Sequence, residues 1–155
     1  MSASSFLSLI QSFAERKGGL QVALDGLQGL TFECDGLTLR VLPHPTDESC
    51  MWLEVDVCDT QEHPAKAWRL LHQLNYVARF DQGWTIGLDL EQTLVLSASA
   101  RVAHGNADSL EELMVDGLTR AQALLGLWRQ LCASEDVTAS ALTRWADLPP
   151  GVIRV

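Results

Sequence analysis

The sequence has little positive charge and no long apolar run. Its 11 Lys and Arg residues stand against 20 Asp and Glu residues, giving a formal net charge of −9. This charge repels phosphate backbones and anionic membrane surfaces, so nucleic acid and anionic lipid are poor partners. No stretch approaches the roughly 18–20 apolar residues of a membrane span, and residues 1–20 lack a basic start followed by an apolar block. We therefore expect a cytoplasmic protein without membrane insertion.

The spacing of cysteine and histidine excludes the common metal sites. The four cysteines, Cys34, Cys50, Cys58 and Cys132, form no CxxC pair, and no two of the four histidines are spaced to share one face. We expect reduced, mostly buried thiols, with no redox pair, no metal and no cofactor.

Catalytic motifs are also missing. The sequence contains no Walker loop, no GxGxxG after a strand, and no GxSxG, HExxH or EF-hand pattern. Glu54 and Asp56 lie two residues apart on a predicted strand, where paired carboxylates can in principle perform acid–base chemistry. A solvated sheet face is the more frequent outcome for such a pair. A binding protein is therefore favoured over an enzyme.

What is present indicates one domain with a real core. The length of 155 residues suits a single domain, and 47% of the residues are hydrophobic. Phe6, Leu9, Ile10 and Phe13 recur at helical spacing and predict an amphipathic helix that begins at about Ser4. Residues 20–29 contain several glycines and predict a loop or a weak edge strand.

Alternating apolar residues predict five strands. Residues 30–34 and 37–41 flank the turn pair Asp35-Gly36 and form a hairpin. Residues 51–57 form a third strand with Trp52, Glu54 and Asp56 on its polar face. A second hairpin covers residues 84–102, with its turn at Glu91-Gln92.

Two further helices follow from their start signals. Pro64 suits the first turn of a helix that ends between Asn75 and Phe80. Asp108 and Glu111 form a variant capping box that opens a helix reaching about Ala133. Such a helix is roughly 39 Å long at 1.5 Å per residue, so we expect part of it to cover a partner subunit.

The element order α-β-β-β-α-β-β-α predicts an α+β fold, an antiparallel sheet with helices packed on it. We divide the chain into a domain over residues 1–133 and a tail over residues 134–155, a short helix plus an extended end. Among the five tryptophans, Trp68, Trp84 and Trp128 fit faces that should be buried, whereas Trp52 and Trp145 are candidates for a contact surface.

Three features of the sequence form a pattern with this element order. They are Asn75 at the close of the second helix, the short strand Trp84–Asp89 with Gly87 before an apolar–acid pair, and a long last helix that carries Trp128. Over roughly residues 4–133 the pattern resembles the class I chaperones of bacterial type III secretion (the Tir chaperone, CesT-like family). The resemblance implies a bacterial cytoplasmic homodimer that binds the N-terminal region of secreted effector proteins in an extended state and keeps them competent for export. The secretion ATPase or a regulatory protein is a further candidate partner.

The resemblance also implies where the contacts lie. Effector binding is expected on the first helix and early strands, and the dimer interface on the second helix and the strand after it. The effector-binding candidates are Phe6, Leu7, Ile10, Leu37, Leu39, Val41 and Leu53, and the dimer-interface candidates are Trp68, Leu71, Trp84 and Ile86. All of them are equally explicable as core residues.

Two other interpretations stay open at this point. One is a regulatory protein of the same fold that sequesters a secretion regulator. The other is a small-molecule-binding or enzymatic α+β domain with Glu54 and Asp56 beside a pocket.

Overall fold

The structure, a computed structural model, describes residues 3–16, 29–47, 49–78, 83–101 and 106–133. The expected tail over residues 134–155, and all but the last residue of the expected loop over residues 20–29, lie outside this part of the chain. Within it the element order is α-β-β-β-α-β-β-α, which confirms the predicted α+β fold. The described helices include none that is long and apolar enough to cross a membrane.

Five antiparallel strands form one sheet in the order β1-β2-β3-β5-β4. The strands are β1 (Leu30–Cys34), β2 (Leu37–Pro43), β3 (Cys50–Asp59), β4 (Trp84–Leu88) and β5 (Thr93–Arg101). The predicted turn between β1 and β2 is confirmed, because Asp35 and Gly36 have φ angles of 51° and 79°, the left-handed values that a two-residue hairpin turn requires. The turn between β4 and β5 starts earlier than predicted: it includes Asp89, whose carboxylate accepts the backbone N–H groups of Glu91 and Thr93.

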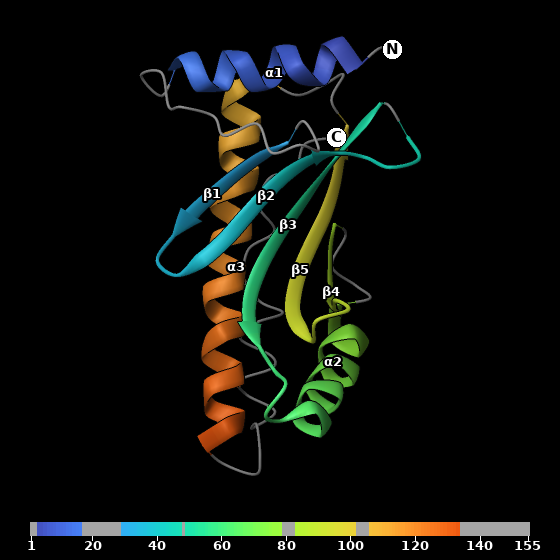
Figure 1. Ribbon diagram of the computed structural model, residues 1–155, viewed down its shortest axis with the longest axis vertical. Coiled ribbons are helices and arrows are strands. Elements are labelled where there is room, and N and C mark those ends of the chain that lie inside the picture. Colours follow the sequence, from blue (N-terminus) through green and yellow to red (C-terminus); the bar gives the residue numbers. More distant parts are fainter. Residues whose placement is uncertain (1–2, 17–28, 48, 79–82, 102–105, 134–155) are drawn as a thin grey trace.

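The described part of the chain has three helices: α1 (Ala3–Arg16), α2 (Pro64–Ala78) and α3 (Ala107–Ala133). Figure 1 shows α3 running behind the sheet, α1 crossing near the first turns of α3, and α2 beside β4. Buried residues of α3 extend from Ala107 to Leu131. The length of α3 is thus used inside this chain, so it needs no partner subunit to explain it.

The start of α3 differs from the predicted capping box. Asn106 accepts the backbone N–H of Ser109 through Oδ1 at 2.9 Å, and the Ser109 hydroxyl accepts the backbone N–H of Asn106 at 2.8 Å. This reciprocal pair satisfies two of the backbone donors that a helix start leaves unpaired. Asp108 lies inside the first turn, where a carboxylate favours the positive end of the helix dipole.

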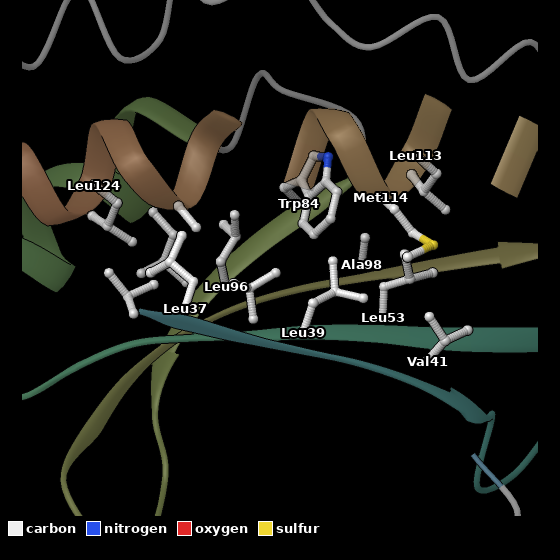
Figure 2. Close-up of a cluster of buried hydrophobic side chains, with 14 of the residues drawn as sticks. Leu37, Leu39, Val41, Leu53, Trp84, Leu96, Ala98, Leu113, Met114 and Leu124 are labelled. Atoms are coloured by element: carbon white, nitrogen blue, oxygen red, sulfur yellow. The ribbon is translucent and has the colours of Figure 1, made fainter. Parts of the chain in front are cut away.

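The core lies between α3 and one face of the sheet. Figure 2 shows Leu37, Leu39 and Val41 of β2 and Leu53 of β3 beneath α3, near Leu113, Met114 and Leu124. Residues two apart on a strand point to the same face, which explains why every second residue of β2 and β3 is buried. At the far end of the core, Phe13 of α1 meets Phe32 of β1 edge to face, with ring centroids 6.0 Å apart.

Candidate binding surface

The face of β2 and β3 opposite α3 is polar and partly exposed. Cross-strand register places Arg40 beside Glu54, Thr38 beside Asp56, and Leu42 beside Trp52 on this face. Among the described helices, α3 packs on the other side of these strands, α2 contacts β4, and α1 contacts α3. We call this surface, formed by the second face of β2 and β3, the open face.

An ion cluster lies at the centre of the open face. Arg40 donates from Nη2 to Oε1 of Glu54 at 2.8 Å and also to Oδ1 of Asp56. The side chains of Arg40, Glu54 and Asp56 are 28%, 28% and 26% exposed. Two adjacent acids are therefore held by one guanidinium, an arrangement that matches the solvated-face interpretation of Glu54 and Asp56 better than an acid–base pair.

Desolvation and neighbouring charges act against each other in this cluster. Partial desolvation raises the pKa of Asp56 above its ordinary value and the charges of Glu54 and Asp89 add to the rise, although the charge of Arg40 and its hydrogen bond act in the opposite direction. Partial burial lowers the pKa of Arg40, but the hydrogen bonds and charges of Glu54 and Asp56 outweigh that effect and leave it raised. The open face is drier at its centre than a fully solvated sheet surface.

Trp52 forms an aromatic patch at one end of the open face. Its side chain is half-buried, and Nε1 donates weakly to Oε2 of Glu54 at 3.4 Å. The ring of His44 lies 5.7 Å away, centroid to centroid, in an edge-on arrangement, and Leu42 is the cross-strand neighbour. The sequence-based prediction that Trp52 lies on a contact surface is compatible with this half-exposed position.

The two edges of the sheet differ. At the β4 edge, Asn75 of α2 donates from Nδ2 to the backbone carbonyl oxygen of Ile86 at 3.3 Å. A helix side chain therefore occupies one of the acceptors of this edge strand. At the other edge, β1 pairs with β2 and with no second strand among those described.

The predicted effector-binding residues are mostly in the core. Six of the seven are buried, namely Phe6, Ile10, Leu37, Leu39, Val41 and Leu53, whereas Leu7 is half-buried. Their burial has a simple cause. Alternation in β2 and β3 and helical spacing in α1 each identify an apolar face but not what covers it, and here α3 contacts all three elements. The structure thus corrects the expectation that these six side chains line an accessible surface. Whether this region contacts an effector stays a prediction.

The predicted dimer-interface residues divide in a similar way. Trp68 is 54% exposed on α2, whereas Leu71, Trp84 and Ile86 are buried within the chain. The prediction that Trp68 is buried is therefore wrong, while those for Trp84 and Trp128 are confirmed. Trp84 contacts α3 through a hydrogen bond from Nε1 to Oδ2 of Asp116 at 2.7 Å, so this chain already uses it internally.

Sequence reasoning missed a buried ionic group next to Trp84. Arg120 is 1% exposed, and its Nε donates to both carboxylate oxygens of Asp116 at 3.1 and 3.2 Å. The available signal was the spacing of an acid and an arginine four residues apart on one helix face. Asp116 accepts hydrogen bonds from both Trp84 and Arg120, which ties β4 to the middle of α3.

The cysteines also differ from expectation. Cys34 is exposed, and Cys50, Cys58 and Cys132 are half-buried, so the prediction of mostly buried thiols is wrong. All four are free thiols. The described residues include no group of three or more His, Cys, Asp or Glu side chains arranged to hold a metal ion.

The fold is similar to that of several proteins of known structure. No protein-family model matches the sequence, and no curated protein matches it. The structure matches a chain of the ExsC–ExsE complex with a TM-score of 0.68 and 24% identity, covering 82% of this chain and 96% of that one. It also matches structures of the Yersinia pestis type III secretion chaperone SycH in complex with a stable fragment of YscM2 (TM-score 0.59, 14% identity, 77% and 98% covered) and of the HopA1–SchA chaperone–effector complex (TM-score 0.60, 15% identity, 84% and 98% covered). The chain therefore has the fold of type III secretion chaperones across most of its length.

Proposed function

We propose that this protein is a type III secretion chaperone, a cytoplasmic homodimer that binds the N-terminal region of secreted effectors in an extended state. One observation carries the proposal. The fold covers 98% of chains from two chaperone complexes, one of them a chaperone–effector complex, so the likeness extends over essentially the whole of those chains. The missing catalytic motifs and the absence of a metal-binding cluster among the described residues agree with a binding role.

An extended client can use the edge of a sheet. A peptide that adds a strand gains backbone hydrogen bonds for affinity and places alternate side chains in pockets for specificity. At β4, one backbone acceptor already belongs to Asn75. We therefore place strand addition at β1, with the client continuing over the half-exposed Trp52 and Leu42 on the open face.

The residue assignments are refined accordingly. Leu7 is the effector-binding candidate that retains exposed surface, and Trp68 is the corresponding dimer-interface candidate. The buried members of both sets belong to the core and support these surfaces without being exposed on them. An exposed tryptophan on a helix is a suitable anchor for a second copy, because large aromatic side chains carry much of the energy of protein interfaces.

The test combines oligomeric state with client conformation. Light scattering on the purified chain should give twice the monomer mass. An isotope-labelled N-terminal segment of a secretion substrate from the same genome should bind and stay extended, with little dispersion in its NMR spectrum. A monomer that binds no such segment would refute the proposal, and binding of a secretion regulator alone would favour the regulatory alternative.

Surface variants locate the two contacts. Leu7→Glu should weaken client binding, and Trp68→Glu should shift the protein toward the monomer. Val115→Glu is the matched control, because Val115 is 56% exposed on α3, a helix that carries neither candidate, and should change neither readout. If the control variant has the same effect as either of the others, the assigned surfaces are wrong.

A further inference from the structure

His44 begins the connection between β2 and β3, and its ring nitrogen Nδ1 accepts hydrogen bonds from the backbone that follows. The N–H groups of Thr46 and Asp47 both donate to Nδ1, at 3.3 and 3.1 Å. The hydroxyl of Thr46 lies 3.4 Å from the same nitrogen. Because a neutral imidazole has one nitrogen without a proton, these contacts make Nδ1 the acceptor and place the proton on Nε2.

This arrangement has the form of an Asx turn, in which a side-chain oxygen of Asn or Asp accepts the backbone N–H two residues further on. Here a histidine nitrogen replaces that oxygen. An amide oxygen remains an acceptor throughout the physiological pH range, whereas Nδ1 becomes a donor when the ring takes a second proton. Histidine ordinarily makes this change between about pH 8 and pH 5. Protonation therefore removes the acceptor on which this turn depends.

The same ring connects the turn to the open face. It is half-buried and lies edge-on to Trp52, with ring centroids 5.7 Å apart. The backbone of His44 is held separately, because its N–H donates to the carbonyl oxygen of Cys50 at 3.2 Å. Loss of the two bonds to Nδ1 thus frees the side chain of His44 to rotate away from Trp52 while the ends of β2 and β3 stay paired.

A carboxylate in the same turn can receive the protonated ring. The Asp47 side chain accepts hydrogen bonds from the backbone N–H and the hydroxyl of Ser49, at 2.9 and 2.6 Å, and from the thiol of Cys50 at 3.3 Å. The bonds from Ser49 and then Cys50 lower the pKa of Asp47, and the charge of His44 adds a smaller effect in the same direction. Asp47 therefore stays ionised over the pH range in which a histidine gains its charge.

The strands around the ring also carry charges. On β3, Glu54 accepts the hydrogen bond from Nε1 of Trp52, which places a second carboxylate beyond the indole. On β2, Arg40 is bound to Glu54 and Asp56, so its charge is already paired. On β5, Arg101 is the register partner of Cys50. Among the described residues, Asp47 is thus the acid of the turn itself and the natural partner of an imidazolium at position 44.

We propose that His44 is a proton-operated switch of the turn between β2 and β3. In its neutral form Nδ1 binds the backbone N–H groups of Thr46 and Asp47 and keeps the ring against Trp52. In its protonated form the ring releases both groups, pairs with the carboxylate of Asp47 and uncovers the indole. The switch changes the surface that the open face presents. It belongs to the chain alone, needs no client or second copy, and does not rest on the proposed function.

The experiment is an NMR titration of the full-length protein from pH 8 to pH 5. The nitrogen shifts of the His44 ring report its tautomer, and should show Nε2 protonated and Nδ1 bare at pH 8. The backbone amides of Thr46 and Asp47 and the indole N–H of Trp52 should then move with the same midpoint as the His44 ring. Relative to the intrinsic rate at each pH, exchange of the two amides should rise roughly two- to tenfold on protonation.

Two variants separate this switch from other titrations. His44→Asn supplies an Asx acceptor that does not titrate, so the signals of Thr46, Asp47 and Trp52 should stay constant over the same range. His72→Asn is the matched control, because His72 is an exposed histidine on α2, and it should leave the titration unchanged. Circular dichroism at both ends of the range establishes that each protein is folded.

Three outcomes would overturn the proposal. The first is a neutral His44 ring that carries its proton on Nδ1. The second is a Trp52 indole signal that does not follow the midpoint of His44. The third is a His44→Asn variant with the same pH dependence as the natural protein, which would assign the change to the carboxylates of the open face instead.

Discussion

The ring of Trp84 lies against the backbone of Gly117, so closely that a Cβ at position 117 would stand 2.6 Å from the ring atom Cη2. Two further ring atoms would lie at 3.2 and 3.4 Å. The ring has little freedom to withdraw, because its Nε1 is hydrogen-bonded to Asp116, the residue before Gly117. Glycine at this position is what allows the edge strand β4 to approach the middle of α3.

Replacing Gly117 by alanine should therefore destabilise the fold. Alanine favours a helix over glycine by about 1 kcal/mol, but the displaced ring should reverse the sign and lower the free energy of unfolding by ~1–3 kcal/mol. Gly126→Ala is the matched control on the same helix, because a Cβ there meets nothing within 4 Å. It should raise the free energy of unfolding by about 0.5–1 kcal/mol. Urea denaturation measures both, and equal changes would contradict this account.

The bond between Asp116 and Arg120 should show strong coupling. Asp116→Asn removes the charge that faces a buried guanidinium and should cost about 2–4 kcal/mol. Because the cost arises from the remaining buried cation, the double variant Asp116→Asn/Arg120→Met should be less destabilised than the sum of the two single variants. A double-mutant cycle by chemical denaturation measures this difference. Simple additivity would show that the pair is not coupled.

Asp56 should make stability depend on pH in a direction opposite to that of an ordinary salt bridge. Because its pKa is raised in the folded state, its favourable contribution is complete below the unfolded pKa of about 4 and is lost as pH rises through the folded pKa. Asp56→Asn should therefore unfold at a higher urea concentration than the natural protein at pH 7. The advantage should disappear toward pH 3. A variant that is less stable at pH 7 would show that the pairing with Arg40 outweighs desolvation.

Thr60 should prove important for the turn between β4 and β5. Its side chain is 1% exposed, and both its hydroxyl and its backbone N–H donate to the carbonyl oxygen of Gln92, at 2.6 and 3.1 Å. Thr60→Val keeps the shape but removes the hydroxyl, and should lower the free energy of unfolding by ~1 kcal/mol. Thr60→Ser keeps the donor and should recover part of that loss. Thermal unfolding followed by circular dichroism distinguishes the two, and identical midpoints would contradict a role for the hydroxyl.

Local signals in the sequence were sufficient for most of the fold. Asp35-Gly36 determines a turn through the backbone angles of those two residues alone, and Pro64 marks a helix start for an equally local reason. The start of α3 was placed wrongly because Asn106 and Ser109 form a reciprocal cap that competes with the pattern of Asp108 and Glu111. Both pairs of residues have the three-residue spacing of a capping box. Which pair caps the helix depends on the residue at which the backbone enters it.

The candidate surface was harder to predict, because accessibility is a property of the whole fold. Trp68 and Trp84 are alike in the sequence, but α2 buries a narrow stripe of Ala67, Leu70, Leu71 and Leu74 against its neighbours, which leaves Trp68 on its flank. Trp84 instead faces a glycine on a helix more than thirty residues further along the chain. No local pattern around residue 84 indicates that contact. The register shift between Asp56 and Cys58 in β3 is likewise determined by pairing with β5.

The position of α3 at the end of the described chain has a consequence for synthesis. The ribosome delivers all five strands before residues 107–133, so the apolar side of the sheet, with Leu39, Leu53 and Leu96, has no cover while translation continues. A nascent chain arrested before Ala107 would display that side to every other protein around it. Until its last helix has been synthesised, this protein is therefore itself prone to aggregation and depends on protection by other factors.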